Sequence, residues 1–98
     1  MKKLTTPKVA IAGAEIGNSI KSWRILYGLK AVQVAERAGI SLGTLRKIES
    51  GNLSVNINAF FEVLRSLGLL ENLTTSLDPL ESDLGRARMT DNMPKRVR

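Results

Sequence analysis

The stretch "AERAGISLGTLRKIESG", residues 35–51, predicts two short helices joined by a tight bend. Gly39 can adopt the left-handed backbone conformation that ends the first helix. Ser41 offers a hydroxyl oxygen that can cap the second helix, and Ile40 is expected to fill the angle between the two. Ala35 is small enough for the second helix to pack closely across it. The stretch therefore favours a tight, nearly perpendicular pair of helices, placed at residues 31–38 and 42–49.

Helical signals continue on both sides of this pair. Upstream, a helix is expected from Ala14 to Tyr27, because Ile16, Ile20, Trp23 and Tyr27 recur at spacings of four, three and four and form one apolar face. Downstream, Asn56 is the expected N-cap of a helix over residues 57–67. A further short helix is expected over residues 80–86, so the fold class is all-α, with four to five helices.

The ends of the chain are less regular. Residues 1–12 read as a flexible basic arm, and the sequence "MTDNMPKRVR", residues 89–98, as a flexible basic tail. The stretch "LLENLTTSL", residues 69–77, fits a helical turn or a strand. We therefore divide the chain into the arm, a helical domain over residues 13–69, and an extension over residues 70–98 for dimerisation or partner binding.

Composition narrows the function. The net charge is +6, so nucleic acid, anionic lipid and acidic proteins are all open as partners. The chain has no Cys and no His, which excludes disulfides, thiolate or imidazole metal sites and most hydrolase mechanisms. Its carboxylates are scattered singly, so we expect no catalytic residues, no metal and no cofactor. The longest apolar stretch, "VAIAGAEIG", is too short to span a bilayer, and we expect a cytoplasmic, nucleoid-associated protein with no membrane partner.

One segment resembles a known family. The sequence "GLKAVQVAERAGISLGTLRKIESG", residues 28–51, is similar to the helix-turn-helix domain of the phage repressor and Cro superfamily, also called XRE-like. The resemblance extends over about residues 17–69. It implies a DNA-binding domain whose third helix lies in the major groove. It also implies a structural pair between Arg24 in the first helix and Glu49 at the end of the third.

A narrower resemblance follows. The sequence "NINAFFEVLRSLGL", residues 56–69, looks like the fourth helix of HipB-type regulators, which are the DNA-binding partners of HipA-type kinase toxins. That resemblance implies a toxin–antitoxin operon, a HipA-type kinase toxin or companion antitoxin as partner, and a short C-terminal strand for dimerisation at residues 69–77. Trp23, Phe60 and Phe61 are then expected in the core or a dimer interface, with Phe61 the better interface candidate.

Candidate DNA-binding residues lie on the second and third helices and in the following loop. They are basic side chains, hydroxyls and amides that can contact bases or phosphates, together with the apolar pair at the start of the third helix. The set is Lys30, Gln33, Ser41, Leu42, Gly43, Thr44, Arg46, Lys47, Asn52, Ser54 and Asn56.

Two positions depart from the family pattern. Where the family usually begins its second helix with a polar pair that anchors a phosphate, this chain has Lys30 and Ala31. At the start of the third helix, Leu42 and Gly43 replace the polar side chains that usually read bases. Leu42 can meet a thymine methyl group and Gly43 allows close approach, so polar contacts are expected one turn later, at Arg46 and Lys47.

The sequence thus predicts a repressor of transcription, of its own operon, that binds an inverted-repeat operator in double-stranded DNA as a homodimer. The alternative is a protein-interaction module, an antitoxin or adaptor, that engages a HipA-type kinase. Enzyme function is not expected.

Overall fold

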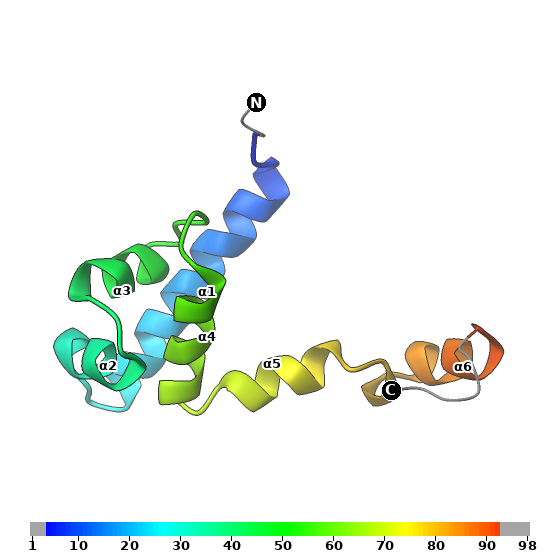
Figure 1. Cartoon of the computed structure of the whole chain (residues 1–98). Coiled ribbons are helices and arrows are strands. Elements are labelled where there is room, and N and C mark those ends of the chain that lie inside the picture. The colour runs from blue at the N-terminus through cyan, green and yellow to red at the C-terminus, as the bar shows by residue number, and fades with distance from the viewer. Residues whose placement is uncertain (1–3, 93–98) are drawn as a thin grey trace. The chain divides into compact units, whose positions relative to one another are not determined.

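The computed structural model describes residues 4–92 and divides the chain into two compact units (Figure 1). Unit 1 ends at Gly68 and unit 2 begins at Leu69. The described residues form helices without any strand, so the all-α prediction is confirmed, and none of these helices has the length and apolarity to cross a membrane. The elements are α1 (Pro7–Leu26), α2 (Ala31–Ala38), α3 (Leu42–Glu49), α4 (Ile57–Ser66), α5 (Leu70–Leu77), the 3₁₀ helix η1 (Pro79–Glu81) and α6 (Asp83–Asn92).

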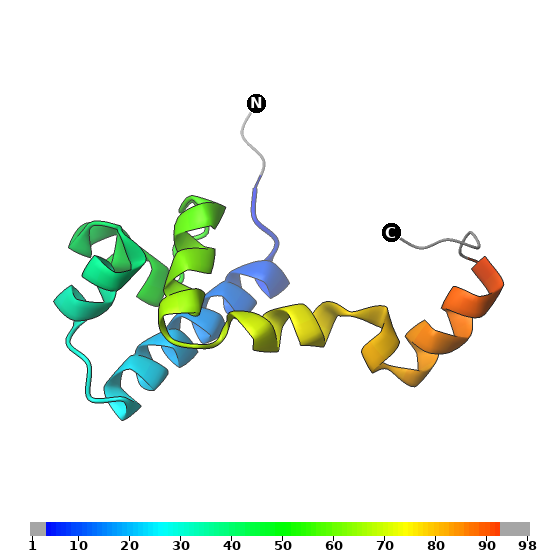
Figure 2. The same cartoon turned by 60° about the horizontal axis from the view of Figure 1, so that its bottom comes forward.

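Helix α1 is longer than the sequence predicted. It begins at Pro7 rather than Ala14, so residues 7–12 are helical instead of belonging to a flexible arm. The reason is local: the Thr6 hydroxyl accepts a hydrogen bond from the Val9 N–H at 3.4 Å, and proline is favoured at the first helical position. These first turns extend beyond the other helices of unit 1 (Figures 1 and 2), and all of residues 7–12 are exposed.

The face that α1 buries is not the predicted apolar stripe. Gly13, Gly17 and Ile20 are its buried residues. Of the stripe, only Ile20 is in the core, whereas Ile16, Trp23 and Tyr27 remain exposed. The prediction failed because it counted apolar side chains, while the closest helix contact is made by residues without a side chain.

The bend between α2 and α3 is as predicted, with the same helix bounds. Gly39 has a φ of 72° and its N–H and that of Ile40 bond to carbonyls of the last turn of α2, which closes the helix. Helix α2 packs on α3 and α4, and α1 packs on α3. The core they enclose consists of Ile20, Val34, Ala35, Ala38, Leu45, Ile48, Ala59, Val63, Leu64 and Leu67.

Unit 2 is built differently. Residues 70–77 form helix α5, so the dimerisation strand implied by the HipB resemblance is wrong. The physical reason is the spacing of the leucines, because Leu70, Leu73 and Leu77 recur at intervals of three and four and so lie on one face of a helix. No residue of α5, η1 or α6 is buried.

The predicted short helix over residues 80–86 is two elements. Asp78 caps η1, accepting a hydrogen bond from the Leu80 N–H at 3.0 Å. Ser82 then interrupts the run and its hydroxyl accepts from the Gly85 N–H at 2.9 Å, which starts α6. Helix α6 continues to Asn92, so part of the predicted flexible tail is helical; the rest, residues 93–98, lies outside the described residues.

Candidate nucleic-acid interface

The start of α3 is fixed by its cap. The Ser41 hydroxyl oxygen accepts a hydrogen bond from the Thr44 N–H at 3.0 Å, and the same hydroxyl donates to the Thr44 hydroxyl oxygen at 2.9 Å. Ser41 is exposed and Thr44 is half-buried. Both hydroxyls therefore take part in capping α3, and only the hydroxyl proton of Thr44 remains free to donate outward.

The end of α3 is held against α1 by glycines. A Cβ at Gly17 would lie 2.6 Å from the Ile48 carbonyl oxygen and 2.8 Å from that of Glu49, so only glycine lets the two backbones meet there. Gly51, with a φ of 84°, makes the reciprocal contact, since a Cβ there would lie 2.7 Å from the Cα of Ala14. The spacing of Gly13 and Gly17, four residues apart on α1, is the sequence signal that could have revealed this contact.

Two turns further along α1, an ion pair fixes the same end of α3. The Arg24 Nε donates to a Glu49 carboxylate oxygen at 2.7 Å, and a terminal guanidinium nitrogen donates to the other at 3.2 Å. The remaining terminal nitrogen donates to the Leu29 carbonyl oxygen at 3.0 Å. The two side chains are only 13% and 8% exposed, so the pair is shielded and joins α1, the α1–α2 turn and α3 into one rigid frame.

The outer face of α3 carries few but distinct groups. Gly43, Arg46 and Lys47 are exposed, and Leu42 is half-buried. Among the described residues, a Cβ at Gly43 would meet only the Ser41 hydroxyl, at 3.8 Å, so none of them requires glycine there. The face therefore presents a bare backbone at its first turn, an apolar edge beside it, and two cationic hydrogen-bond donors one turn later.

The start of α2 supplies a second set of donors. The Gln33 side-chain oxygen accepts a hydrogen bond from the Lys30 N–H at 2.8 Å, which caps the helix. A lysine ammonium group has no acceptor, so this is the one cap bond that the pair can make. The Gln33 amide hydrogens and the exposed Lys30 ammonium are left to interact with an anion at this helix end.

The loop after α3 has its own internal bonds. The Asn52 side-chain oxygen accepts from the Ser54 N–H at 2.8 Å and from the Ser54 hydroxyl at 2.6 Å. Asn56 caps α4, accepting from the Asn58 and Ala59 N–H groups at 2.7 and 3.2 Å. All three predicted site residues of this loop are exposed, and each has a structural role besides any contact with DNA.

The structure adds Lys21 to this surface. An open cleft of about 260 Å³ is lined by Lys21, Arg24, Ala31, Arg46, Glu49 and Ser50. It joins α1 to the start of α2 and the end of α3, and Glu49 is neutralised by its pair with Arg24. Sequence reasoning missed Lys21 because the predicted α1 stripe drew attention to its apolar face; its position three residues before Arg24 was the available signal.

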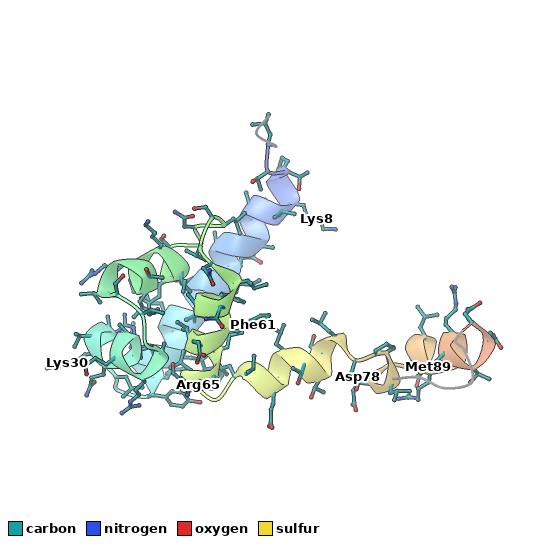
Figure 3. The ribbon with its side chains drawn as sticks, viewed as in Figure 1. Lys8, Lys30, Phe61, Arg65, Asp78 and Met89 are labelled. Carbon is teal, nitrogen blue, oxygen red and sulfur yellow. The ribbon has the colours of Figure 1, made fainter. Side chains whose placement is uncertain are left out.

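The start of α2 and the exposed apolar side chain of Phe61 lie on different sides of unit 1. In Figure 3, Lys30 at the start of α2 projects from one side of the unit, whereas Lys8 and Phe61 project from the other. The exposed donors at the start of α2 and on the outer face of α3 include three cations, Lys30, Arg46 and Lys47. Such a set suits a polyanion whose edges are read by hydrogen bonds.

Comparison with known proteins agrees with this geometry. Residues 20–71, more than half of the chain, match the family of domains described as helix-turn-helix. No curated protein and no solved structure matches the chain. The matched segment covers the bend, the pair of Arg24 and Glu49, and every residue of the predicted DNA-binding set.

Proposed function

The chain belongs to the XRE-type helix-turn-helix family of the phage repressor and Cro superfamily, and we propose that it is a sequence-specific repressor of transcription. Members of this family are DNA-binding transcription regulators and are generally not enzymes. The observation that carries the proposal is the exposed face of α3, which is held in place at its start by Ser41 and at its end by Gly17 and the Arg24–Glu49 pair.

Base reading is assigned to the outer face of α3. Leu42 contacts a thymine methyl group, and Gly43 lets the helix approach the base edges without a Cβ in the way. Arg46 and Lys47, one turn later, donate to acceptors of the major groove or to phosphates. The open space around Gly43 supports this assignment, because no contact with any residue between 4 and 92 explains the glycine.

Phosphate binding is assigned to the residues around this face. They are ammonium groups, side-chain amides and the Thr44 hydroxyl, which keep protons free to donate. Ser41 and Ser54 join them by exchanging their internal donor bonds, to Thr44 and Asn52, for a phosphate. Such contacts set the position of a protein on the duplex and make its affinity fall steeply with salt. The set is Lys21, Lys30, Gln33, Ser41, Thr44, Asn52, Ser54 and Asn56.

The repressor acts as a homodimer on an inverted repeat, which we place upstream of its own gene. A two-fold dimer sets its recognition helices about 34 Å apart, one turn of the duplex. A gel-shift assay with the gene's own upstream region tests this, with a scrambled duplex of equal composition as control. Binding of the upstream duplex at least about 100-fold more tightly is expected. Equal affinity for the two duplexes would refute specific repression.

A second candidate is a protein-interaction role in a toxin–antitoxin operon. Unit 2 exposes Leu77, Leu80 and Leu84, at 72%, 52% and 66%, and these side chains offer an apolar surface for a HipA-type kinase or a companion antitoxin. A repressor can also hold a toxin, so the two functions are compatible. Co-purification of the neighbouring gene product with the full chain is expected, and its loss on replacing the three leucines by serine is the control.

A further inference from the structure

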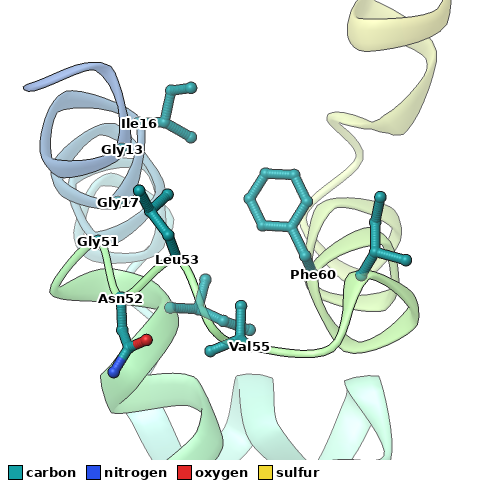
Figure 4. Close-up of a pocket in the computed structure, with 10 residues that line it drawn as sticks. Gly13, Ile16, Gly17, Gly51, Asn52, Leu53, Val55 and Phe60 are labelled. Atoms are coloured by element: carbon teal, nitrogen blue, oxygen red, sulfur yellow. The ribbon is translucent and has the colours of Figure 1, made fainter. Parts of the chain in front are cut away.

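An apolar groove lies in unit 1 between α1 and α4 (Figure 4). Its volume is about 270 Å³, and Ile16 on α1 faces Phe60 on α4 across it, with Leu53 and Val55 from the intervening loop between them. None of its lining residues is charged. Ile16 and Leu53 are both 49% exposed, so the groove is open to solvent.

The apolar surface continues along α1 on both sides of the groove. Val9, Ile16 and Trp23 are spaced seven residues apart and therefore lie on one face of the helix. They are 51%, 49% and 40% exposed. On α4, Ile57 lines the groove and is 66% exposed, and Phe61, 39% exposed, has its ring centroid 6.0 Å from that of Phe60, which also lines the groove. Exposed apolar residues that are contiguous in this way mark an interaction surface.

Part of this surface lies on helical turns that nothing else in unit 1 supports. Residues 7–12 are all exposed, and they include Val9 and Ile11, whose branched side chains are weak helix formers. Two helical turns at the end of a helix gain little stability without packing. A partner that covers the face of α1 containing Val9 would supply the missing packing.

Charge indicates what that partner is. Lys8 and Glu15 each precede a residue of the apolar stripe, Val9 and Ile16, and so lie along the same edge of it. Seven residues separate them, about 10.5 Å along the helix, which is too far for them to pair with each other. Neither forms an ion pair in the part of the chain that the structure describes.

We propose that the α1 face and the groove are the interface between two copies of this chain, packed through antiparallel α1 helices on a two-fold axis beside Ala12. The axis falls midway between Val9 and Ile16, so Val9 of each copy meets Ile16 and enters the groove of the other. The same axis sets Lys8 of one copy against Glu15 of the second. An isologous contact of this kind needs one self-complementary patch, which this surface provides.

The interface is expected to be weak. Interfaces of standard size bury about 800 Å² on each partner, from 20–30 residues a side, and fewer residues take part here. A dissociation constant in the micromolar range follows, so that assembly is completed on DNA. The inference rests on the proposed function only in naming the surface of the dimer that binds the operator; the self-association itself is measured without DNA.

Sedimentation equilibrium of the full chain across micromolar concentrations tests the interface. Wild-type chain is expected to dimerise, and Val9→Ser to raise the dissociation constant tenfold or more, because symmetry places the change in the interface twice. The matched control is Ile11→Ser, which alters a residue of the same two turns that is 60% exposed but projects from nearly the opposite side of α1. Its dissociation constant is expected to stay within twofold of wild type.

A charge exchange gives an independent readout. Lys8→Glu sets like charges against Glu15 of the partner and is expected to weaken the dimer, although an acidic residue in the first turn favours the helix itself. Adding Glu15→Lys restores opposite charges and is expected to restore dimerisation. Circular dichroism confirms that each variant is folded.

A monomeric wild type, an equal effect of Val9→Ser and Ile11→Ser, or no rescue by the double exchange would each overturn the interface. These outcomes are distinct from failure of the proposed function. A dimer that Val9→Ser disrupts, but that binds upstream and scrambled duplexes equally, would keep the interface and refute the repressor. Specific binding that Val9→Ser and Ile11→Ser affect alike would keep the repressor and refute the interface.

Discussion

Units 1 and 2 are both helical, yet they are stabilised in different ways. In unit 1, four helices enclose a core in which Leu45 and Val63 have no exposed surface, and a shielded ion pair joins α1 to α3. In unit 2, no residue of the described helices is buried, and the ion pair of Arg86 with Asp83 is exposed. Helices form in both units, but only in unit 1 is a helix packed against several others, which is what holds a recognition surface in a fixed position.

The largest expected effect comes from a core substitution. Leu45→Ala should lower the free energy of unfolding by about 2–5 kcal/mol, because it leaves a cavity in a fully enclosed site. The matched change in unit 2, Leu84→Ala, should change it by less than about 0.5 kcal/mol, since that side chain is 66% exposed. Urea unfolding followed by fluorescence of Trp23, the single tryptophan, reports on unit 1 directly. Equal effects would contradict the contrast between the units.

The ion pairs provide a smaller contrast. Arg24→Ala should cost about 2–3 kcal/mol, because Glu49 and the Leu29 carbonyl oxygen would lose their shielded partner. Arg86 also bonds a carboxylate and a carbonyl oxygen, those of Asp83 and Leu80, but in solvent. Arg86→Ala should therefore change stability by less than about 1 kcal/mol. Thermal unfolding of both variants compares them, and a larger loss for Arg86→Ala would show that unit 2 is the more strongly held.

Two glycines of unit 1 should respond in opposite ways to substitution by alanine, because Gly17 is closely packed and Gly43 is exposed. Gly17→Ala should cost about 1–3 kcal/mol, because the new Cβ would force α1 away from the backbone at the end of α3. Gly43→Ala should instead stabilise α3 by about 0.5–1 kcal/mol, because alanine favours the helix and the site is open. Urea unfolding measures the free energy of unfolding of each variant, which should fall for Gly17→Ala and rise for Gly43→Ala. Stabilisation by Gly17→Ala would mean that α1 and α3 do not approach as closely as described.

Much of the fold could be predicted because its signals are local. Gly39 and Ser41 mark the bounds of α2 and α3, and both helices begin and end where the sequence indicated. The start of α1 was missed although Thr6 and Pro7 form an equally local cap, because the threonines, lysines and proline of residues 1–12 suggested a flexible basic arm. Residues 69–77 could not be assigned from pattern alone, since leucines at this spacing fit a helix while the resemblance implied a strand.

The site was only partly predictable, because its support depends on contacts between distant elements. The buried face of α1 contains Gly13 and Gly17, which carry no side chain for an apolar pattern to detect. Lys21 joins the basic surface only because α1 crosses α3 at that contact, which the sequence does not state. By contrast, Leu42 and Gly43 were identified from their position in the motif, and the structure shows what surrounds them.

The first turn of α3 is proposed to read bases through an apolar edge, that of Leu42. Selection of preferred duplexes from a randomised pool, by wild type and by Leu42→Gln, tests it most directly. The preferred base at one position in each half-site is expected to change, from thymine to a base that glutamine can hydrogen-bond, while affinity for non-specific duplex stays within about twofold. An unchanged preference, or a uniform loss of affinity for all sequences, would contradict the claim and assign Leu42 to packing.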